Sequence, residues 1–218
     1  MSDIRSLAPI TEADFTRVDD YITARREAWE RHLEAGLAEL IGHLMAAGYT
    51  PSTAEQQPEL TSRSDALGTR EVEVSGRLKG TKAIVGKMRR FGEPLRVMLD
   101  IWGYRVVVAT QNELDDVASH CAALWEAPTP RELLLRHGKL QFEWWRDYRR
   151  RSYAGLSPAT TAQYDQAIHL NRKAPFGIVE IQVMTLDLYV RVYCDPASED
   201  SHDRFVARRQ ELFRRNEQ

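Results

Sequence analysis

A short strand that runs directly into a helix is the feature that most restricts how this chain can fold. Val72 and Val74 alternate with polar residues, which is the period-two pattern of a half-buried strand. From Ile84 onward apolar residues return at helical spacing, and Gly92 followed by Pro94 ends the helix. Elements joined in this way belong to a layered structure in which helices pack on a sheet.

Cations surround the start of this helix. Arg77 and Lys79 share one face of the extended segment, and Lys87 and Arg90 lie one turn apart on the helix. Free backbone N–H groups and the positive end of the helix dipole attract anions at a helix N-terminus. The stretch therefore suits a polyphosphate, and a solvated basic helix face is the alternative interpretation of the same charges.

The rest of the chain predicts further helices and strands around this unit. Thr11 and Asp14 form a capping box before a long amphipathic helix that ends at Gly48. Trp144–Tyr148, followed by three arginines, fits a helix that frays into a basic loop.

We expect the segment from Leu95 through Asp100 to be a short helix or turn. We further expect a strand at Tyr104–Ala109, a helix capped by Asn112, strands at Tyr164–Asn171 and Phe176–Thr185, and a helix at Ser201–Arg215. Strands interleaved with helices, with helices at both ends, indicate a mixed α/β layer structure.

Composition narrows the class of protein. The 218 residues are 43% hydrophobic, which is enough for one sizeable core, and the formal net charge of −2 gives no general affinity for nucleic acid. Two cysteines, Cys121 and Cys194, make neither a disulfide framework nor a zinc site, which fits a reducing compartment. Because no N-terminal apolar segment or long apolar run is present, we expect a cytoplasmic protein with no membrane partner.

Two carboxylates stand in apolar surroundings. Asp100 precedes one expected strand and Glu180 lies inside another, where a charge is costly unless it is paired or binds a metal. Mg²⁺ takes one or two carboxylates together with substrate phosphates, so this pair near the cations predicts a Mg-nucleotide site. A structural salt bridge between Glu180 and Arg105 is the alternative. His169, also in a strand, is either a phosphate contact or a partly buried core residue, since no second metal ligand is suitably spaced.

An ordered set of short motifs resembles the synthetase domain of the RelA/SpoT family of alarmone synthetases. The set covers residues 70 to 190 and consists of Gly76-Arg-Leu-Lys79, Lys87-Met88, Asp100-Ile-Trp-Gly-Tyr-Arg105, Arg146-Asp-Tyr148, Gln166-Ala-Ile-His169 and Val179-Glu-Ile-Gln-Val-Met-Thr185. The short chain looks like a small alarmone synthetase, most similar to the toxic type of toxin–antitoxin pairs and phages. The resemblance implies a nucleotidyltransferase-like fold with a mixed sheet. It divides the chain into an N-terminal helical region at 1–49, a linker or mobile loop at 50–69, a synthetase domain at 70–195 and a C-terminal helix at 196–218.

The resemblance also implies an activity and roles for named residues. Such enzymes are Mg-dependent ATP pyrophosphokinases that transfer the β,γ-pyrophosphate of ATP to the 3′-hydroxyl of GDP or GTP. Asp100 and Glu180 would hold Mg²⁺, and Glu180, supported by Gln182, is alternatively the group that activates the hydroxyl. The residues implied on the ATP side are Arg77, Lys79, Lys87 and Arg105. Those assigned to the acceptor side are Tyr164, His169, Arg150 and Arg151.

Departures from the family pattern leave the acceptor open. Asp165 stands where the family has a tyrosine that stacks on the acceptor base, and Tyr164 comes one position early. Gly80 and Ala83 stand in place of serines that touch phosphate, and Met184 in place of an arginine. The acceptor is therefore a guanine nucleotide, an adenine nucleotide or the 3′-CCA end of tRNA. For tRNA, the backbone contacts would come from Arg146, Arg149, Arg150, Arg151 and the C-terminal arginines. The alternative is that these arginines only form solvated surface.

A different class of function also fits this pattern. A degenerate synthetase would bind nucleotide without turnover and act as an interaction module. The retention of both Asp100 and Glu180 argues against that class, because a pure binder has little use for the pair. An antitoxin protein is one partner that this pattern allows. The acidic N-terminal helix either packs on the domain or covers its site. The oligomeric state stays open.

Overall fold

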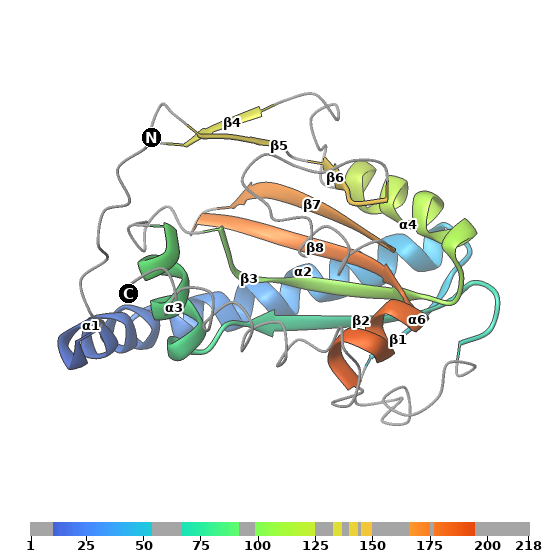
Figure 1. The fold of residues 1–218 in the computed structure, drawn as a ribbon. Coiled ribbons are helices and arrows are strands. Elements are labelled where there is room, and N and C mark those ends of the chain that lie inside the picture. Colours follow the sequence, from blue (N-terminus) through green and yellow to red (C-terminus); the bar gives the residue numbers. More distant parts are fainter. Residues whose placement is uncertain are drawn as a thin grey trace, which may run out of the picture.

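A six-stranded mixed sheet forms the centre of the molecule. The structure is a computed structural model, and it describes residues 11–53, 67–91, 99–124, 133–136, 140–143, 145–149, 166–174 and 177–194. The strand order is β1-β2-β3-β8-β7-β6, in which the β1/β2 and β3/β8 pairs are parallel and the other three pairs are antiparallel (Figure 1). The bounds are Thr50–Thr53 for β1, Glu71–Leu78 for β2, Leu99–Val108 for β3, Trp145–Asp147 for β6, Ala167–Ala174 for β7 and Gly177–Thr185 for β8. The expected mixed α/β layer structure is confirmed.

Two long helices cover one face of this sheet, and a short helix with the turn after it covers one end of the opposite face. Helix α2 packs on β1, β2 and β3 and passes behind the sheet in Figure 1, and α4 packs on β3, β8 and β7. Helix α6 and the π-helical turn that follows it lie against the opposite face near the end of β8. The helix bounds are Glu12–Thr23 for α1, Arg26–Ala46 for α2, Thr81–Phe91 for α3, Gln111–Leu124 for α4, Leu186–Tyr189 for α6 and Val190–Cys194 for the π-helical turn. A separate hairpin pairs β4, Leu133–Arg136, with β5, Leu140–Glu143.

The main core lies between the sheet and the two long helices. Alternate residues of each strand point to this side, and they include Trp102, Tyr104, Ile181 and Leu170. The Tyr104 hydroxyl donates a hydrogen bond of 3.1 Å to the backbone oxygen of His32 in α2. A Cβ on the neighbouring Gly36 would collide with that hydroxyl, so the absence of a side chain lets α2 approach the sheet.

The expected N-terminal helix is present but divided. The Thr11–Asp14 capping box is confirmed, and Gly48, with φ of 85°, ends the second helix as expected. A turn at Ala24 and Arg25 separates α1 from α2. The break lets α1 pack on α3 while α2 packs on the sheet, where Trp29, Leu40 and Leu44 are buried; a straight helix would follow only one of these surfaces.

Three sequence-based assignments were wrong. Thr50–Thr53, placed in the linker, is an edge strand that pairs in parallel with β2. Asp100, placed in a helix or turn, lies in β3, which begins at Leu99. Trp145–Asp147, placed in a fraying helix, is an edge strand whose residues pair with Leu170, His169 and Ile168. All three segments gain their backbone hydrogen bonds from strands distant in the sequence, so local composition gave no signal for them.

The remaining assignments are closer to the structure. The helix that Asn112 was expected to cap begins at Gln111, two residues earlier than a cap at Asn112 implies, because Glu113 accepts hydrogen bonds from the backbone and hydroxyl of Thr110. The strand expected at Phe176–Thr185 is confirmed as β8, and the one at Tyr164–Asn171 is shifted to β7. The helix expected at Ser201–Arg215 falls outside the described residues.

Candidate functional site

Polar side chains form two rows across the sheet face that α2 and α4 leave free. Directly paired residues of neighbouring strands share a face, and residues of opposite parity, such as Tyr104 and Ile181, face the helices. The first row runs through Arg77, Gly103, Glu180 and Asn171, and the second through Ser75, Arg105, Gln182 and His169. Beyond them a third level is mainly apolar, where Val107, Met184 and Ala167 pack against α6 and the π-helical turn.

Glu180 lies at the centre of the first row. Its Oε2 atom accepts hydrogen bonds from Nη2 of Arg77 at 2.9 Å and from Nε2 of Gln182 at 2.8 Å. Its Oε1 atom lies 3.1 Å from Nδ1 of His169. The side chains of Glu180 and His169 are only 7% and 5% exposed. Strands β2, β8 and β7 therefore converge on one buried carboxylate, with a cationic arginine on one side and a histidine on the other.

Charges around Glu180 keep it ionised. Burial by itself would raise the pKa of this carboxyl, but His169, Arg77 and Lys79 together hold the pKa well below its ordinary value. Lys79 follows β2 directly, and its backbone N–H donates a 2.7 Å hydrogen bond to the backbone oxygen of Ile101. The end of β2 is thus fixed beside β3 with two cations, Arg77 and Lys79, next to the carboxylate.

Gly103 makes the contact between Arg77 and Glu180 possible. It stands between them in the first row, and a Cβ at this position would collide with the backbone oxygen of Glu180. Only glycine therefore lets β3 and β8 approach this closely. The absence of a side chain also leaves a gap over β3 that the Arg77 side chain crosses.

Arg105 belongs to a different group of residues. The expected alternative, a structural salt bridge from Arg105 to Glu180, is wrong, because Arg77 takes that place. The Arg105 guanidinium instead lies 3.8 Å from the ring centroid of Tyr193 and 5.3 Å from that of Tyr189. Glu73 is buried nearby, and burial raises its pKa while the charge of Arg105 opposes the rise.

Tyr148 is a residue of the site to which no role was assigned from the sequence. Its ring meets the His169 ring edge-on at a centroid distance of 4.7 Å, and Tyr148 is buried. The Tyr148 backbone N–H donates to the backbone oxygen of Ala167, which fixes the turn after β6 beside β7. Tyr148 therefore restricts the orientation of His169 toward Glu180. The motif Arg146-Asp147-Tyr148 marked this position, but a contact across strands has no signature in one segment.

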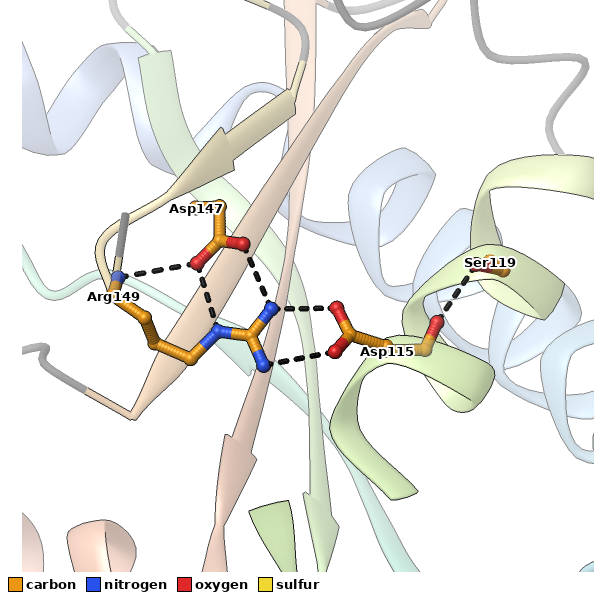
Figure 2. Close-up of polar contacts among 4 residues, drawn as sticks. All are labelled: Asp115, Ser119, Asp147 and Arg149. Atoms are coloured by element: carbon orange, nitrogen blue, oxygen red, sulfur yellow. Dashed lines mark hydrogen bonds and ion pairs between the residues drawn. The ribbon is translucent and has the colours of Figure 1, made fainter. Parts of the chain in front are cut away.

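An arginine clamp fixes the turn that carries Tyr148. Arg149 donates from Nε to Asp147 at 2.8 Å, from Nη2 to Asp147 at 2.7 Å and from Nη1 to Asp115 of α4 at 3.1 Å (Figure 2). These two carboxylates raise the pKa of Arg149, so it stays charged. Under the tRNA alternative Arg149 would contact an RNA backbone, and otherwise it would be solvated; its guanidinium is instead engaged within the protein. The clamp joins the end of β6 to α4.

The structure brings together five of the residues assigned to the site, namely Arg77, Lys79, His169, Glu180 and Gln182. For Lys87 and Asp100 it describes only the backbone, in α3 and in β3. Pairing of β3 with β8 is irregular between Leu99 and Trp102, so Asp100 lies at a bulge on the strand next to that of Glu180. Tyr164, Arg150 and Arg151 lie outside the described residues.

Asp100 and Glu180 are the residues to which the sequence analysis assigns Mg²⁺, and of this pair the structure describes the side chain of Glu180 alone. Within the described ranges, no group of three or more His, Cys, Asp and Glu side chains is arranged to hold a metal. Magnesium bound with a nucleotide needs only one or two carboxylates, because the phosphates and waters supply the other ligands. The ionised carboxylate of Glu180 has about four lone-pair sites, of which Arg77, Gln182 and His169 approach three.

The functional conclusion has to rest on the geometry of the site. No protein-family model matches the chain, and no curated protein matches it. Among the described helices, none is long and apolar enough to cross a membrane. What can be inferred about function therefore comes from the cluster around Glu180 and from the order of the motifs that build it.

Proposed function

We propose that this protein is a Mg-dependent ATP pyrophosphokinase that transfers the β,γ-pyrophosphate of ATP to the 3′-hydroxyl of a guanine nucleotide. The observation that carries the proposal is the buried, ionised Glu180 carboxylate with Arg77 and Lys79 on one side and His169 on the other. A buried carboxylate is expensive for a fold, and a pure structural role would be served as well by apolar residues.

The β2 side of the row suits the donor. Arg77 and Lys79 come from the strand end that leads into α3, whose N-terminal turn offers backbone N–H groups to anions. The Arg77 side chain is 24% exposed, whereas Glu180 is 7% exposed, so the guanidinium stands at the open edge of the cluster. ATP phosphates approaching this edge meet Arg77 and Lys79 first, and Lys87 on α3 is the third cation assigned to them.

The β7 side of the row suits the acceptor. His169 is held between the Tyr148 ring and Glu180, so its orientation is fixed before substrate arrives. The 3′-oxygen of the acceptor attacks the β-phosphorus of ATP, the bond from that phosphorus to the α,β-bridging oxygen breaks, and AMP leaves. The acceptor hydroxyl releases its proton to water in the same reaction.

Glu180 acts chiefly by position and charge. Its low pKa makes it a weak base, so we assign it the tasks of accepting a hydrogen bond from the 3′-hydroxyl and of orienting that group. Gln182 keeps the carboxylate in place through its 2.8 Å hydrogen bond. Bound Mg²⁺ would neutralise phosphate charge, and Asp100 is the carboxylate left to hold it once the open lone-pair site of Glu180 takes the hydroxyl. Phosphoryl transfer depends mostly on such positioning and neutralisation.

A label-transfer assay tests the proposal. Purified protein with Mg²⁺ and ATP labelled in the γ-phosphate is offered GDP, GTP, AMP, ADP and bulk tRNA in parallel, and AMP release is measured. We expect labelled product from GDP or GTP, with one AMP released for each. Label on tRNA alone would replace the acceptor and make the protein a translation toxin. ATP binding without labelled product or AMP would contradict the enzyme and favour an interaction module.

A further inference from the structure

We propose that Asn171 binds the 2′-hydroxyl of the acceptor ribose whose 3′-hydroxyl faces Glu180. The inference rests on the proposed function and deepens it, because it identifies a vicinal diol as the group that the acceptor must present. Asn171 belongs to none of the sequence motifs, and only the pairing of β7 with β8 brings it to the site.

Asn171 is an unsatisfied amide at the centre of the molecule. It is 1% exposed, and in the described structure neither its Nδ2 nor its Oδ1 atom has a hydrogen-bond partner. Buried polar side chains nearly always have partners, and one without them lowers the stability of the free protein. A ligand that enters the site can supply these missing hydrogen bonds.

Its position points to the site. Asn171 pairs directly with Glu180 across the β7/β8 ladder, so the two side chains share the free face of the sheet. The Oε1 atom of Gln182, which supports Glu180, also lacks a partner in the described structure. Two open hydrogen-bonding groups thus flank the ionised carboxylate, and Asn171 lies on the side away from Arg77.

The chemistry of these groups fits a diol. An amide offers both donors and an acceptor, as a hydroxyl requires, and the nearby Glu180 carboxylate disfavours an anionic group. Side chains directly opposite in an antiparallel pair have Cβ atoms about 4.5–5.5 Å apart. Hydroxyls on adjacent ribose carbons can therefore reach both side chains, with the 3′-hydroxyl on Glu180 and the 2′-hydroxyl on Asn171. Free ribonucleotides and RNA 3′ ends share this diol.

Binding without turnover tests the inference separately from the proposed activity. Without ATP, affinities are measured for GDP and 2′-deoxy-GDP, and for a short RNA ending in CCA with a terminal ribose or 2′-deoxyribose. We expect the wild-type protein to prefer the ribose form of its acceptor by about tenfold, the value of one good hydrogen bond. Asn171→Leu should bind both forms equally. No ribose preference in the wild-type protein, or an undiminished one in Asn171→Leu, would overturn the inference.

Thermal stability gives a second measurement. Replacing an asparagine that stabilises the fold would lower Tm, whereas the inference predicts that Tm rises. Asn171→Leu removes an unsatisfied buried amide at similar volume, so we expect Tm to rise by about 2–4 °C. Asn112→Leu, on the exposed surface of α4, is the matched control and should leave Tm and ribose preference unchanged. A Tm of Asn171→Leu that stays the same or falls would contradict the inference. Absence of label transfer, by contrast, would count against the proposed activity alone.

Discussion

Two arginine–carboxylate clusters in this molecule look alike and differ in how many of the hydrogen-bonding groups in and beside them have partners. In the clamp of Figure 2, Arg149 donates to Asp147 and Asp115 from three nitrogen atoms, and the cluster joins a strand end to α4. In the site, Arg77 and Glu180 join β2 to β8, and unpartnered atoms of Asn171 and Gln182 lie beside them.

The difference separates a structural ion pair from a binding site. Breaking the clamp would leave the largely buried Asp147 without its cation, so the clamp serves the fold. The Glu180 cluster has open hydrogen-bonding groups beside it, which we propose that the acceptor completes. The two clusters are also connected, because Tyr148, which packs on His169, lies between Asp147 and Arg149 in the sequence.

The largest effect is expected from Glu180→Gln. Gln keeps the volume and an acceptor oxygen but removes the charge that orients the hydroxyl, so we expect turnover to fall by about 10²–10³ with the fold retained. Transfer of label from ATP, normalised to folded protein, measures this. Glu39→Gln, on the exposed face of α2, is the control and should be fully active. Comparable activity of the two variants would show that the Glu180 cluster is structural.

Gly103→Ala tests the backbone approach on which the site is built. The added methyl group would meet the backbone oxygen of Glu180, whereas Gly80→Ala adds its methyl group where no atom lies within 4 Å. We expect Gly103→Ala to lose about 3 kcal/mol or more of unfolding free energy, a size typical of steric conflict in a packed core. Gly80→Ala should be nearly neutral. Urea unfolding compares them, and equal stability would mean that β3 and β8 are further apart.

Arg149→Leu should affect stability and spare the chemistry. It leaves Asp147 buried without its partner, while the half-exposed Asp115 is solvated by water, so we expect a loss of about 2–3 kcal/mol. Activity per folded molecule, measured well below the melting temperature, should fall much less than in Glu180→Gln, because the backbone hydrogen bond from Tyr148 to Ala167 still holds the turn beside β7. Arg17→Leu, at an exposed ion pair, is the control and should be nearly neutral in both assays. If Arg149→Leu instead lost RNA binding at unchanged stability, the clamp would be the binding site and the Glu180 cluster the structural one.

The pH dependence of stability offers a smaller test. Because the folded-state pKa of Glu180 lies below its unfolded value, its contribution is present at neutral pH and is lost as pH falls from the unfolded value through the folded one. Within that acid window the wild-type protein should lose up to about 1.4 kcal/mol per pH unit more than Glu180→Gln. Urea unfolding between pH 7 and pH 3 measures this, and parallel curves would refute the low pKa.

The sequence predicted the elements of the site better than its contacts. Alternation and helical spacing place Arg77 at a strand end before α3, and a carboxylate within the apolar strand at Glu180 indicates a special role. Partners from distant strands carry no such local pattern. The three residues of β6 are too few to show a period, and the contact of Arg105 with Tyr193 depends on a turn after β8. Asn171 became noticeable only through its pairing with Glu180.

A structure determined with Mg²⁺ and a non-hydrolysable ATP analogue tests the central claim most directly. The account predicts the polyphosphate on the free face of the sheet, in contact with Arg77 and Lys79 and on the opposite side of Glu180 from Asn171. An analogue bound elsewhere, such as against α2 and α4, or a Glu180 cluster untouched by the ligand would contradict it.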